Sequence, residues 1–579
     1  MKDRMIYIMM LSILILVFYG TMAAYGSVEL TVLNSMERIG QNEPVFGKRA
    51  AVLKAAKNEV ESFQVVVAAV NENISVVNAE ISDLVSVGGE RIENEHIKLY
   101  REEYVRVRKS TRRAELPPGL YADPLVPFIN PVTGTPIEPR GQHRERWGAP
   151  VVTVGHEMYA LPFDVFKGQN QPLWIDVHVP ANAAAGDYSG TFTVTTDSES
   201  TAEIPVTLTV WDFTLPDGPT HKNHFGSFRN ITRYFNVEGD SDRYKDIEMR
   251  YCETMAEHRI NPPIPRSLLP EVNDDGSLTV IPERHEKLKD FLTRLHVTDF
   301  EIPRAPFKEP TTTNRDKVIR YVKDFYAYLK ENGWHTRSYY YMHDEPNLSE
   351  NYALVRDYGK LVHDAVPEMR CLVVEQTTSQ DSSWPDIDPA VDIWCPLWSF
   401  IHRESIDKKI AQGDEVWSYT ALTQRTPQYH PDYEKKKDYD PPYWHIDRPL
   451  TSYRIPTWIN RQYNITGLLY WSTITMVLDP WNNPAFSHFG THWNGGGFLL
   501  YPGIPCGIDG AISCMRFKNL RDGMEDYEYF VILEKLGGKN AVKKIVDSIA
   551  PNWWEFSKKP EDFIRAREML AEEIVRHTQ

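Results

Sequence analysis

The sequence predicts a multidomain β plus α/β protein: an N-terminal antiparallel β-sandwich, then a (β/α)8 TIM-like barrel with a helical C-terminal tail. Alternating and β-branched runs fill the chain up to about residue 215, a pattern typical of strands. The turn-forming stretch Leu215-Pro216-Asp217-Gly218-Pro219 follows and indicates a domain boundary. Beyond it, strand-like runs alternate with amphipathic helices, as in a parallel barrel.

A chain of 579 residues is too long for one hydrophobic core, so two or three domains are expected. We assign residues 1–26 to a signal peptide, 27–218 to the sandwich, 219–512 to the barrel and 513–579 to the C-terminal helices.

The N-terminal segment has the layout of a secretory signal. Lys2 and Arg4 precede an apolar run over residues 5–18, and small residues follow. This pattern predicts cleavage near Gly26 and a secreted, periplasmic or cell-surface protein. An uncleaved anchor is the alternative, because the apolar run is only slightly shorter than a membrane span. No membrane association beyond this signal is expected.

Composition narrows the function classes. The formal net charge of -16 argues against a nucleic-acid partner, which requires a basic surface. Aromatic residues make up 12% of the chain, and their flat faces suit sugar rings as well as core packing. The five cysteines are scattered, without disulfide or metal-ligand spacing. No cofactor and no metal are expected.

The predicted sandwich contains β-rich runs at residues 62–67, 173–179, 190–194 and 204–210. Residues 101–155 differ, being rich in Pro, Arg and Gly and poor in periodicity. We predict a long irregular insertion there, either a functional loop or a cover over a domain interface.

The predicted barrel has eight candidate strands, at residues 224–228, 261–266, 298–303, 337–343, 371–376, 392–397, 415–420 and 467–472. Helical periodicity lies between several of them, as at 315–331 and 352–366. This count fits a (β/α)8 barrel. The tail is expected to be helical, over 515–536 and then in two further short helices, the last over 563–577.

Two adjacent carboxylates stand out within the barrel. An aromatic run over residues 339–341 favours a strand, and Pro346 ends it. Asp344 and Glu345 are therefore expected at the C-terminal tip of the fourth strand, on the rim where barrel enzymes carry out catalysis.

Adjacent carboxylates suit one form of glycosidic bond cleavage. Cleavage passes through an oxocarbenium-like transition state and requires an acid for the leaving oxygen. When the 2-acetamido group of the substrate attacks the anomeric carbon, one carboxylate can orient that group while its neighbour is the acid. Like charges also raise one of the two pKa values. On this mechanism Glu345 is the general acid and Asp344 the acetamide partner.

Other interpretations of the pair remain open. Asp344 and Glu345 could form a solvated turn or a helix N-cap. His343 suggests a metal, but no second histidine lies at a ligand spacing. A Ser-His-Asp hydrolase is not supported, because no Gly-x-Ser-x-Gly elbow occurs.

Polar and aromatic residues also occur at the ends of the neighbouring predicted strands. We expect six side chains to contact a sugar: His343, Glu375, Trp398, Trp417, Tyr419 and Trp471. The tryptophans could instead belong to the core, and Glu375 could be a separated nucleophile.

Five motifs resemble a known family. They are His343-Asp344-Glu345-Pro346 and the stretches 58–64, 180–190, 497–503 and 521–529. Together they resemble glycoside hydrolase family 123, within the broader domain-of-unknown-function 4091 family, over nearly the whole mature chain.

The resemblance implies a β-sandwich followed by a (β/α)8 barrel, and a β-N-acetylgalactosaminidase that retains anomeric configuration by substrate assistance. It also implies that Glu345 is the acid and Asp344 the acetamide stabiliser, on a glycan with terminal N-acetylhexosamine. Glu525 and Asp526 belong to the resemblance, but basic neighbours on the same predicted helix favour a structural ion-pair network. The alternatives are a glycosidase of other specificity and a non-catalytic glycan-binding surface protein.

Overall fold

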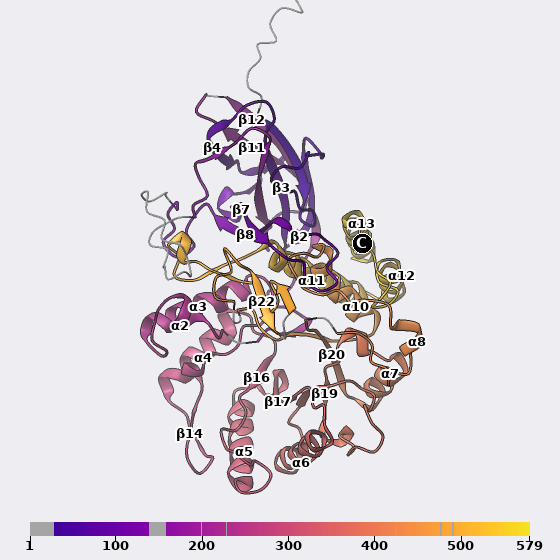
Figure 1. Cartoon of the computed structure of the whole chain (residues 1–579). Coiled ribbons are helices and arrows are strands. Elements are labelled where there is room, and N and C mark those ends of the chain that lie inside the picture. The colour runs from indigo at the N-terminus through magenta and orange to yellow at the C-terminus, as the bar shows by residue number, and fades with distance from the viewer. Residues whose placement is uncertain are drawn as a thin grey trace, which may run out of the picture.

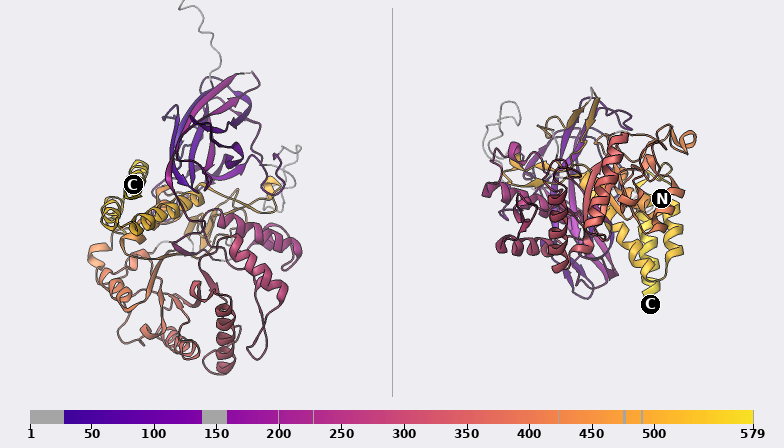
Figure 2. Two further views of the ribbon diagram at one scale, coloured as in Figure 1. Left: turned by 180° about the vertical axis from the view of Figure 1, so that it is seen from behind. Right: turned by 90° about the horizontal axis from the view of Figure 1, so that it is seen from below.

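A computed structural model of the protein describes residues 28–578 except 138–157, 199, 227, 423, 475, 476, 489 and 490 (Figure 1). The predicted signal peptide therefore lies outside the described residues. Among the helices that are described, none is long and apolar enough to cross a membrane. The indigo-to-purple β-rich part stands above the magenta-to-orange α/β part, and yellow C-terminal helices lie beside their junction (Figures 1 and 2).

The N-terminal part consists of two sheets. The first has the order β1 (Glu29–Asn34), β3 (Val60–Ala69), β10 (Gln169–His178), β7 (Ile97–Val107) and β8 (Gly119–Pro127). The second has the order β2 (Ala51–Lys57), β12 (Thr201–Thr214), β11 (Gly186–Thr195), β4 (Ile74–Ile81) and β9 (Phe163–Val165). In addition, β5 (Leu84–Ser86) pairs with β11, and β6 (Arg91–Ile92) pairs with β5.

Period-two patterning forms this sandwich. Along β12 buried and less buried residues alternate, so one face points to the core. Val65, Val67, Phe192 and Val206 are buried between the sheets. Pairing departs from the prediction at one place, because β2 runs parallel to β12; the sandwich is therefore not purely antiparallel.

The prediction of an irregular insertion over residues 101–155 is partly wrong. Residues 101–107 continue β7, and 119–127 form β8, which pairs antiparallel with it. Three charged residues in succession, at 101–103, interrupt the alternation expected of a strand, while Val105 and Val107 are buried. These two side chains join the core shared with the C-terminal part, so β7 helps to form the interface between the two parts. The rest of the insertion, 138–157, lies outside the described residues.

The C-terminal part is built on a seven-stranded parallel sheet. Its order is β13 (Lys222–His224), β21 (Gly467–Tyr470), β20 (Glu415–Thr420), β19 (Ile393–Trp394), β18 (Cys371–Val374), β17 (Ser338–Asp344) and β16 (Phe300–Ile302). The main helices of this part are α3 (Asp242–Ala256), α4 (Pro282–Arg294), α5 (Arg315–Glu331), α6 (Ser349–Ala365), α7 (Arg403–Gln412), α9 (Thr451–Arg454) and α10 (Pro456–Gln462).

The prediction of a strand at 261–266 is wrong. Within the described residues β13 and β16 do not pair with each other, so the sheet forms a nearly closed barrel. Pro262, Pro263 and Pro265 lack the backbone N–H that a ladder requires. Side chains replace the missing ladder, because the Asn261 N–H donates to Asn223 Oδ1 at 2.7 Å. The sheet therefore has a seam where an eighth strand would lie.

Shorter elements complete this part. They are α2 (Ile231–Tyr234), α8 (Tyr433–Lys436), and the hairpins β14 (Glu271–Val272) with β15 (Leu278–Thr279), β22 (Ala485–His488) with β23 (Thr491–Asn494), and β24 (Tyr501–Pro502) with β25 (Ala511–Ile512).

The C-terminal helices are α11 (Met515–Lys535), α12 (Lys539–Ile549) and α13 (Pro560–Thr578). Helix α11 is buried along most of its length, charged residues included. Arg259 Nε forms an ion pair with the Glu525 carboxylate at 3.1 Å, and Arg454 Nη2 forms one with the Asp526 carboxylate at 2.7 Å. The predicted structural ion-pair network at these two carboxylates is confirmed, although its closest partners are on other elements.

Candidate active site

Asp344 and Glu345 lie at the C-terminal end of β17. The register between β17 and β18 shifts between Tyr341 and His343. Such an irregularity re-aims the side chains that follow it, and bulges are common beside active sites. The Glu345 N–H donates to Val374 O at 3.1 Å, which fixes the backbone immediately after the strand.

The two carboxylates have different surroundings. Asp344 is exposed and accepts a hydrogen bond from the Tyr341 hydroxyl at 3.1 Å. Glu345 is half-buried and accepts a hydrogen bond from the Tyr419 hydroxyl of β20 at 2.5 Å. The adjacent acids are therefore held by separate partners on two strands.

The backbone of Glu345 has a φ of 45°. For a residue other than glycine this left-handed conformation costs about 1–2 kcal/mol. Strain of this kind persists where surrounding contacts impose it, and it gathers at active sites. Here the bonds to Val374 and Tyr419 impose it.

The surroundings of Glu345 favour its protonated form. Burial raises the pKa of the Glu345 carboxyl above its ordinary value, the Tyr419 hydroxyl lowers it in part, and the charge of Asp344 raises it. Burial and nearby Glu345 raise the pKa of Tyr419 well above its ordinary value, so its hydroxyl remains a donor. An acid with a raised pKa can protonate a leaving group near neutral pH.

Replacing Tyr419 with phenylalanine should move the basic limb of the kcat/KM profile to higher pH. The hydroxyl lowers the pKa of Glu345, and its removal lets that pKa rise further. A general acid is active below its pKa, so activity then persists to higher pH. Phenylalanine at Tyr439, which is exposed, is the control. A limb that stays in place or moves to lower pH contradicts this assignment.

Glu375 lies immediately after β18 and is buried. Its carboxylate accepts hydrogen bonds from the Gln376 N–H at 2.9 Å and from Gln380 Nε2 at 3.0 Å. Gln380 Nε2 also donates to Pro346 O at 3.1 Å, which connects Glu375 to the loop after Asp344 and Glu345. Burial raises the pKa of Glu375 to about 8, with a smaller contribution from the charge of Glu345. Glu375 is therefore largely protonated at neutral pH.

His343 and Trp471 are the other predicted contacts with some exposure. His343 is half-buried beside Asp344, and its Nδ1 lies 3.0 Å from Asp344 O. Trp471 follows β21 and packs against Phe486 of β22, with ring centroids 5.8 Å apart. Trp471 keeps part of its surface open, so it can offer a face to a ligand.

Trp398 and Trp417 are packed inside the protein. Trp398 is 1% exposed and Trp417 is 0% exposed. Trp398 donates its indole N–H to Asn460 Oδ1 at 3.0 Å, and Trp417 packs edge-on against Tyr339 in the barrel interior. Neither ring has a face open to a sugar, so the predicted stacking platform has no support at these two positions.

Two residues near the pair were not singled out from the sequence. The sequence indicates only that Tyr341 lies in a strand, yet its hydroxyl contacts Asp344. Arg304 lies just after the C-terminal end of β16, and Asp344 is the last residue of the neighbouring β17. Arg304 Nε donates to Tyr341 O at 2.9 Å, and its guanidinium lies 5.1 Å from the centre of the Tyr341 ring. The rule that located Asp344, a polar residue at a strand end, could also have located Arg304.

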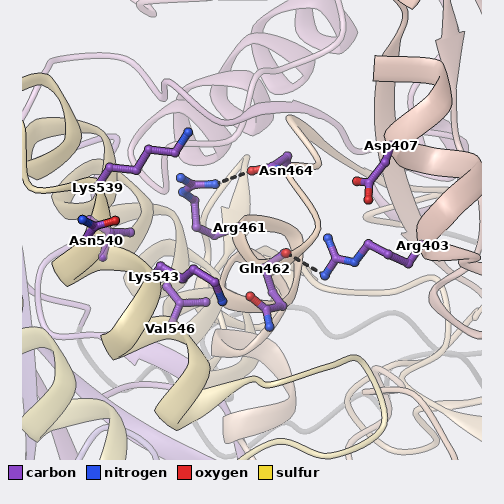
Figure 3. A pocket seen from close by; sticks show the side chains of 10 residues that line it. Arg403, Asp407, Arg461, Gln462, Asn464, Lys539, Asn540, Lys543 and Val546 are labelled. Atoms are coloured by element: carbon purple, nitrogen blue, oxygen red, sulfur yellow. Dashed lines mark hydrogen bonds between the residues drawn. The ribbon is translucent and has the colours of Figure 1, made fainter. Parts of the chain in front are cut away.

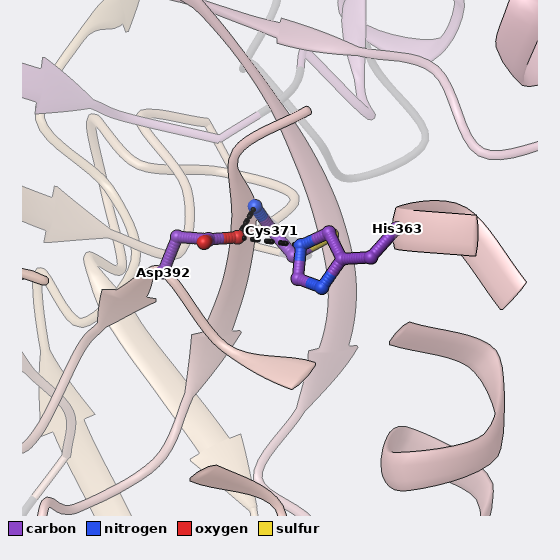
Figure 4. A group of neighbouring side chains, drawn as sticks. All are labelled: His363, Cys371 and Asp392. Atoms are coloured by element: carbon purple, nitrogen blue, oxygen red, sulfur yellow. Dashed lines mark hydrogen bonds and ion pairs between the residues drawn. The ribbon is translucent and has the colours of Figure 1, made fainter. Parts of the chain in front are cut away.

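One cluster has the residue types of a metal site: His363 of α6, Cys371 of β18 and Asp392 before β19 (Figure 4). His363 Nε2 lies 2.9 Å from Asp392 Oδ2, and the Cys371 N–H donates to the same oxygen at 2.7 Å. Burial raises the pKa of the Cys371 thiol well above its usual value, which keeps it protonated. The cluster is best explained as a clamp between α6, β18 and the segment leading into β19.

A basic cavity of about 420 Å³ lies between α7, α10 and α12 (Figure 3). Arg403 donates to Gln462 O at 2.9 Å, and Arg461 donates to Asn464 Oδ1 at 2.8 Å. Its lining comes from the helices and their connecting residues and not from the strand ends that carry Asp344 and Glu345.

Comparison with known families gives two matches. Residues 250–533 match the glycoside hydrolase 123 catalytic domain, and residues 40–196 match the glycoside hydrolase 123 N-terminal domain. Both Asp344 and Glu345 lie within the first match. A search of curated proteins found no match.

Among solved structures, the fold is similar to that of a family 123 glycoside hydrolase from Clostridium perfringens that hydrolyses glycolipid glycans. The identity is 14%, the match covers 95% of this chain and 98% of that chain, and the TM-score is 0.66. A GH5 xyloglucanase from Bacteroides ovatus matches at 9% identity, covering 86% and 100% of the two chains, with a TM-score of 0.29. That score is too low to carry an argument about this fold.

Proposed function

Because the chain belongs to glycoside hydrolase family 123, we propose that this glycoside hydrolase is a retaining β-N-acetylgalactosaminidase that uses the 2-acetamido group of its substrate as nucleophile. The observation that carries the proposal is the pair Asp344 and Glu345, adjacent in the chain and held by different strands. Adjacent carboxylates cannot flank an anomeric carbon as a separated acid and nucleophile do.

In the first step, protonated Glu345 gives its proton to the glycosidic oxygen, and the bond from that oxygen to the anomeric carbon breaks. The acetamide oxygen forms a new bond to the same carbon and closes a five-membered ring. Positive charge develops on the acetamide, and Asp344 stabilises it and orients the amide N–H.

In the second step, the Glu345 carboxylate takes a proton from water, and the water oxygen attacks the anomeric carbon. The bond from the acetamide oxygen to that carbon then breaks. Two inversions at one carbon leave the configuration retained, and Glu345 is protonated again.

The state of Glu375 supports the acetamide as nucleophile. A retaining enzyme with its own nucleophile requires an ionised carboxylate near the anomeric carbon. Burial raises the pKa of Glu375 to about 8, and Gln376 and Gln380 hold its two oxygens. Such a carboxyl is suited to holding the site's geometry and is a poor nucleophile at neutral pH.

We also propose that the enzyme is exported, secreted, periplasmic or at the cell surface, with a glycan as its partner. The basic and apolar layout of residues 1–26 supports this. Detection of the mature N-terminus by mass spectrometry tests it, with cleavage near Gly26 as the expected result.

A screen of nitrophenyl glycosides tests the sugar. The β-N-acetylgalactosaminide should be hydrolysed, and the β-galactoside, which lacks the acetamide, should show no detectable turnover. The β-N-acetylglucosaminide, inverted at the 4-hydroxyl, should be slower than the galactosaminide. Faster hydrolysis of the β-galactoside would overturn the proposal.

A further inference from the structure

A cavity of about 680 Å³ opens at the seam between β13 and β16. It exists because the proline-rich segment at 261–266 does not complete the sheet. Side chains of the barrel interior line one side, including His224, Glu301 and Tyr339, while Leu269 and Phe325 contribute apolar surface. The seam is therefore hollow and is not filled by a strand.

Three arginines line this cavity: Arg229, Arg266 and Arg304. All three are exposed. In the part of the chain that the structure describes, the side chains of Arg229 and Arg266 have no hydrogen-bond or ion-pair partner, and Arg304 uses only Nε, on Tyr341 O. Most of the guanidinium donors of the cavity are thus free for a ligand.

The carboxylates of the cavity do not balance this charge. Asp299 is already paired with Arg370, at 3.2 Å, and with Lys222, at 3.8 Å. Burial raises the pKa of Glu301 to about 7, although the charges of Arg304 and Arg266 lower it in part, so Glu301 offsets these two arginines only partly at neutral pH. Burial lowers the pKa of His224 to about 4, which leaves that ring neutral. The cavity is therefore positive overall.

The cavity adjoins the catalytic pair through Tyr341. Arg304 lies over the ring of this tyrosine, whose hydroxyl contacts Asp344. The His224 ring lies 6.0 Å from the Tyr341 ring, centre to centre. A group bound at the arginines can therefore belong to the same glycan that meets Asp344 and Glu345.

We propose that the seam cavity binds an anionic substituent of the glycan, a sulfate ester or a sugar carboxylate, through Arg229, Arg266 and Arg304. Guanidinium groups pair with such oxyanions in a bidentate manner. This assignment rests on the proposed function for the identity of the reacting sugar.

The test compares three aryl β-N-acetylgalactosaminides that differ at C6: hydroxymethyl, 6-O-sulfate and 6-carboxylate. The variant carries Arg229→Gln and Arg266→Gln together. The wild type should have a higher kcat/KM for a charged substrate than for the neutral one. In the variant, the ratio of these two kcat/KM values should fall by at least about tenfold, as expected when charge-assisted hydrogen bonds are lost. The sulfate and carboxylate arms identify which anion is bound.

Controls separate charge from folding. Arg565→Gln, at an exposed position of α13, should leave the ratio unchanged. Lysine at both cavity positions keeps the charge but loses the bidentate fork, so it should restore part of the ratio. The melting temperature of each variant shows whether the fold is intact.

Calorimetric titration of Glu345→Gln with the same three sugars reports binding without turnover. Tighter binding of a charged sugar, lost in the double arginine variant, supports the cavity even if no aryl substrate is hydrolysed. Failure of the proposed function alone would appear as this binding without turnover in the wild type. Equal binding of charged and neutral sugars, or an unchanged ratio in the double variant, would overturn the inference.

Discussion

Glu345→Gln is expected to lower kcat by about 10²–10⁴-fold, the range that a general acid contributes. The amide cannot protonate the leaving oxygen, and it cannot accept a proton from water in the second step. The hydrogen bond from the Tyr419 hydroxyl can still be accepted by the amide oxygen, so the fold should remain intact.

The loss of kcat/KM, which reports the first step, should depend on the leaving group. A dinitrophenyl group leaves without much protonation, whereas a sugar leaving group requires it, so the second substrate should lose more. Glu350→Gln, at an exposed position of α6, is the matched control and should retain activity. Equal losses for both leaving groups would contradict the acid role in the first step.

Asp526→Ala is expected to destabilise the protein by about 3–5 kcal/mol, as when one partner of a buried ion pair is removed. Asp526 accepts two hydrogen bonds from Arg454, from Nε and Nη2, each at 2.7 Å, and one from Trp458 Nε1 at 2.9 Å. Its removal leaves the Arg454 guanidinium, 2% exposed, without its bidentate partner in the interior.

Denaturant unfolding followed by fluorescence measures this loss. The matched control is Asp547→Ala on α12, which breaks an exposed i,i+4 pair with Lys543 and should cost no more than about 0.5 kcal/mol. Similar losses for the two variants would show that the buried network does not hold α11 in place.

The five resembling motifs do not all serve chemistry. Glu59, in the motif at 58–64, pairs with Arg567 of α13 at 2.9 Å. Tyr501, in the motif at 497–503, donates to Asp123 at 2.7 Å. These contacts join the sandwich to the C-terminal part. The contacts of Glu59 and Tyr501 therefore explain the motifs at 58–64 and 497–503 by the buried interface, whereas the motif at 180–190 is mostly exposed, between β10 and the first residues of β11.

Local patterns predicted the strands of the barrel and the position of Asp344 and Glu345, because an aromatic run ending at a proline is readable without tertiary context. Closure of the barrel was not predicted correctly, although Pro262, Pro263 and Pro265 are visible in the sequence. The apolar character of residues 262–265 indicates a strand, although a proline has no backbone N–H to donate to a neighbouring strand.

The tryptophans show a second limit. A residue near a strand end points into or out of the barrel according to the parity of its position, and predicted boundaries are uncertain by a few residues. Trp417 and Trp398 could therefore not be separated from Trp471, which alone of the three is partly exposed. Likewise the bond from Tyr419 to Glu345 joins β20 and β17 and is invisible to local patterns.

Inhibition by the thiazoline analogue of N-acetylgalactosamine tests substrate assistance most directly, because it imitates the ring formed when the acetamide oxygen bonds to the anomeric carbon. The account predicts competitive inhibition with a Ki at least about a hundredfold below KM, as for an analogue of a state along the reaction path. No inhibition, together with a covalent glycosyl adduct on Glu375 found by mass spectrometry, would contradict it.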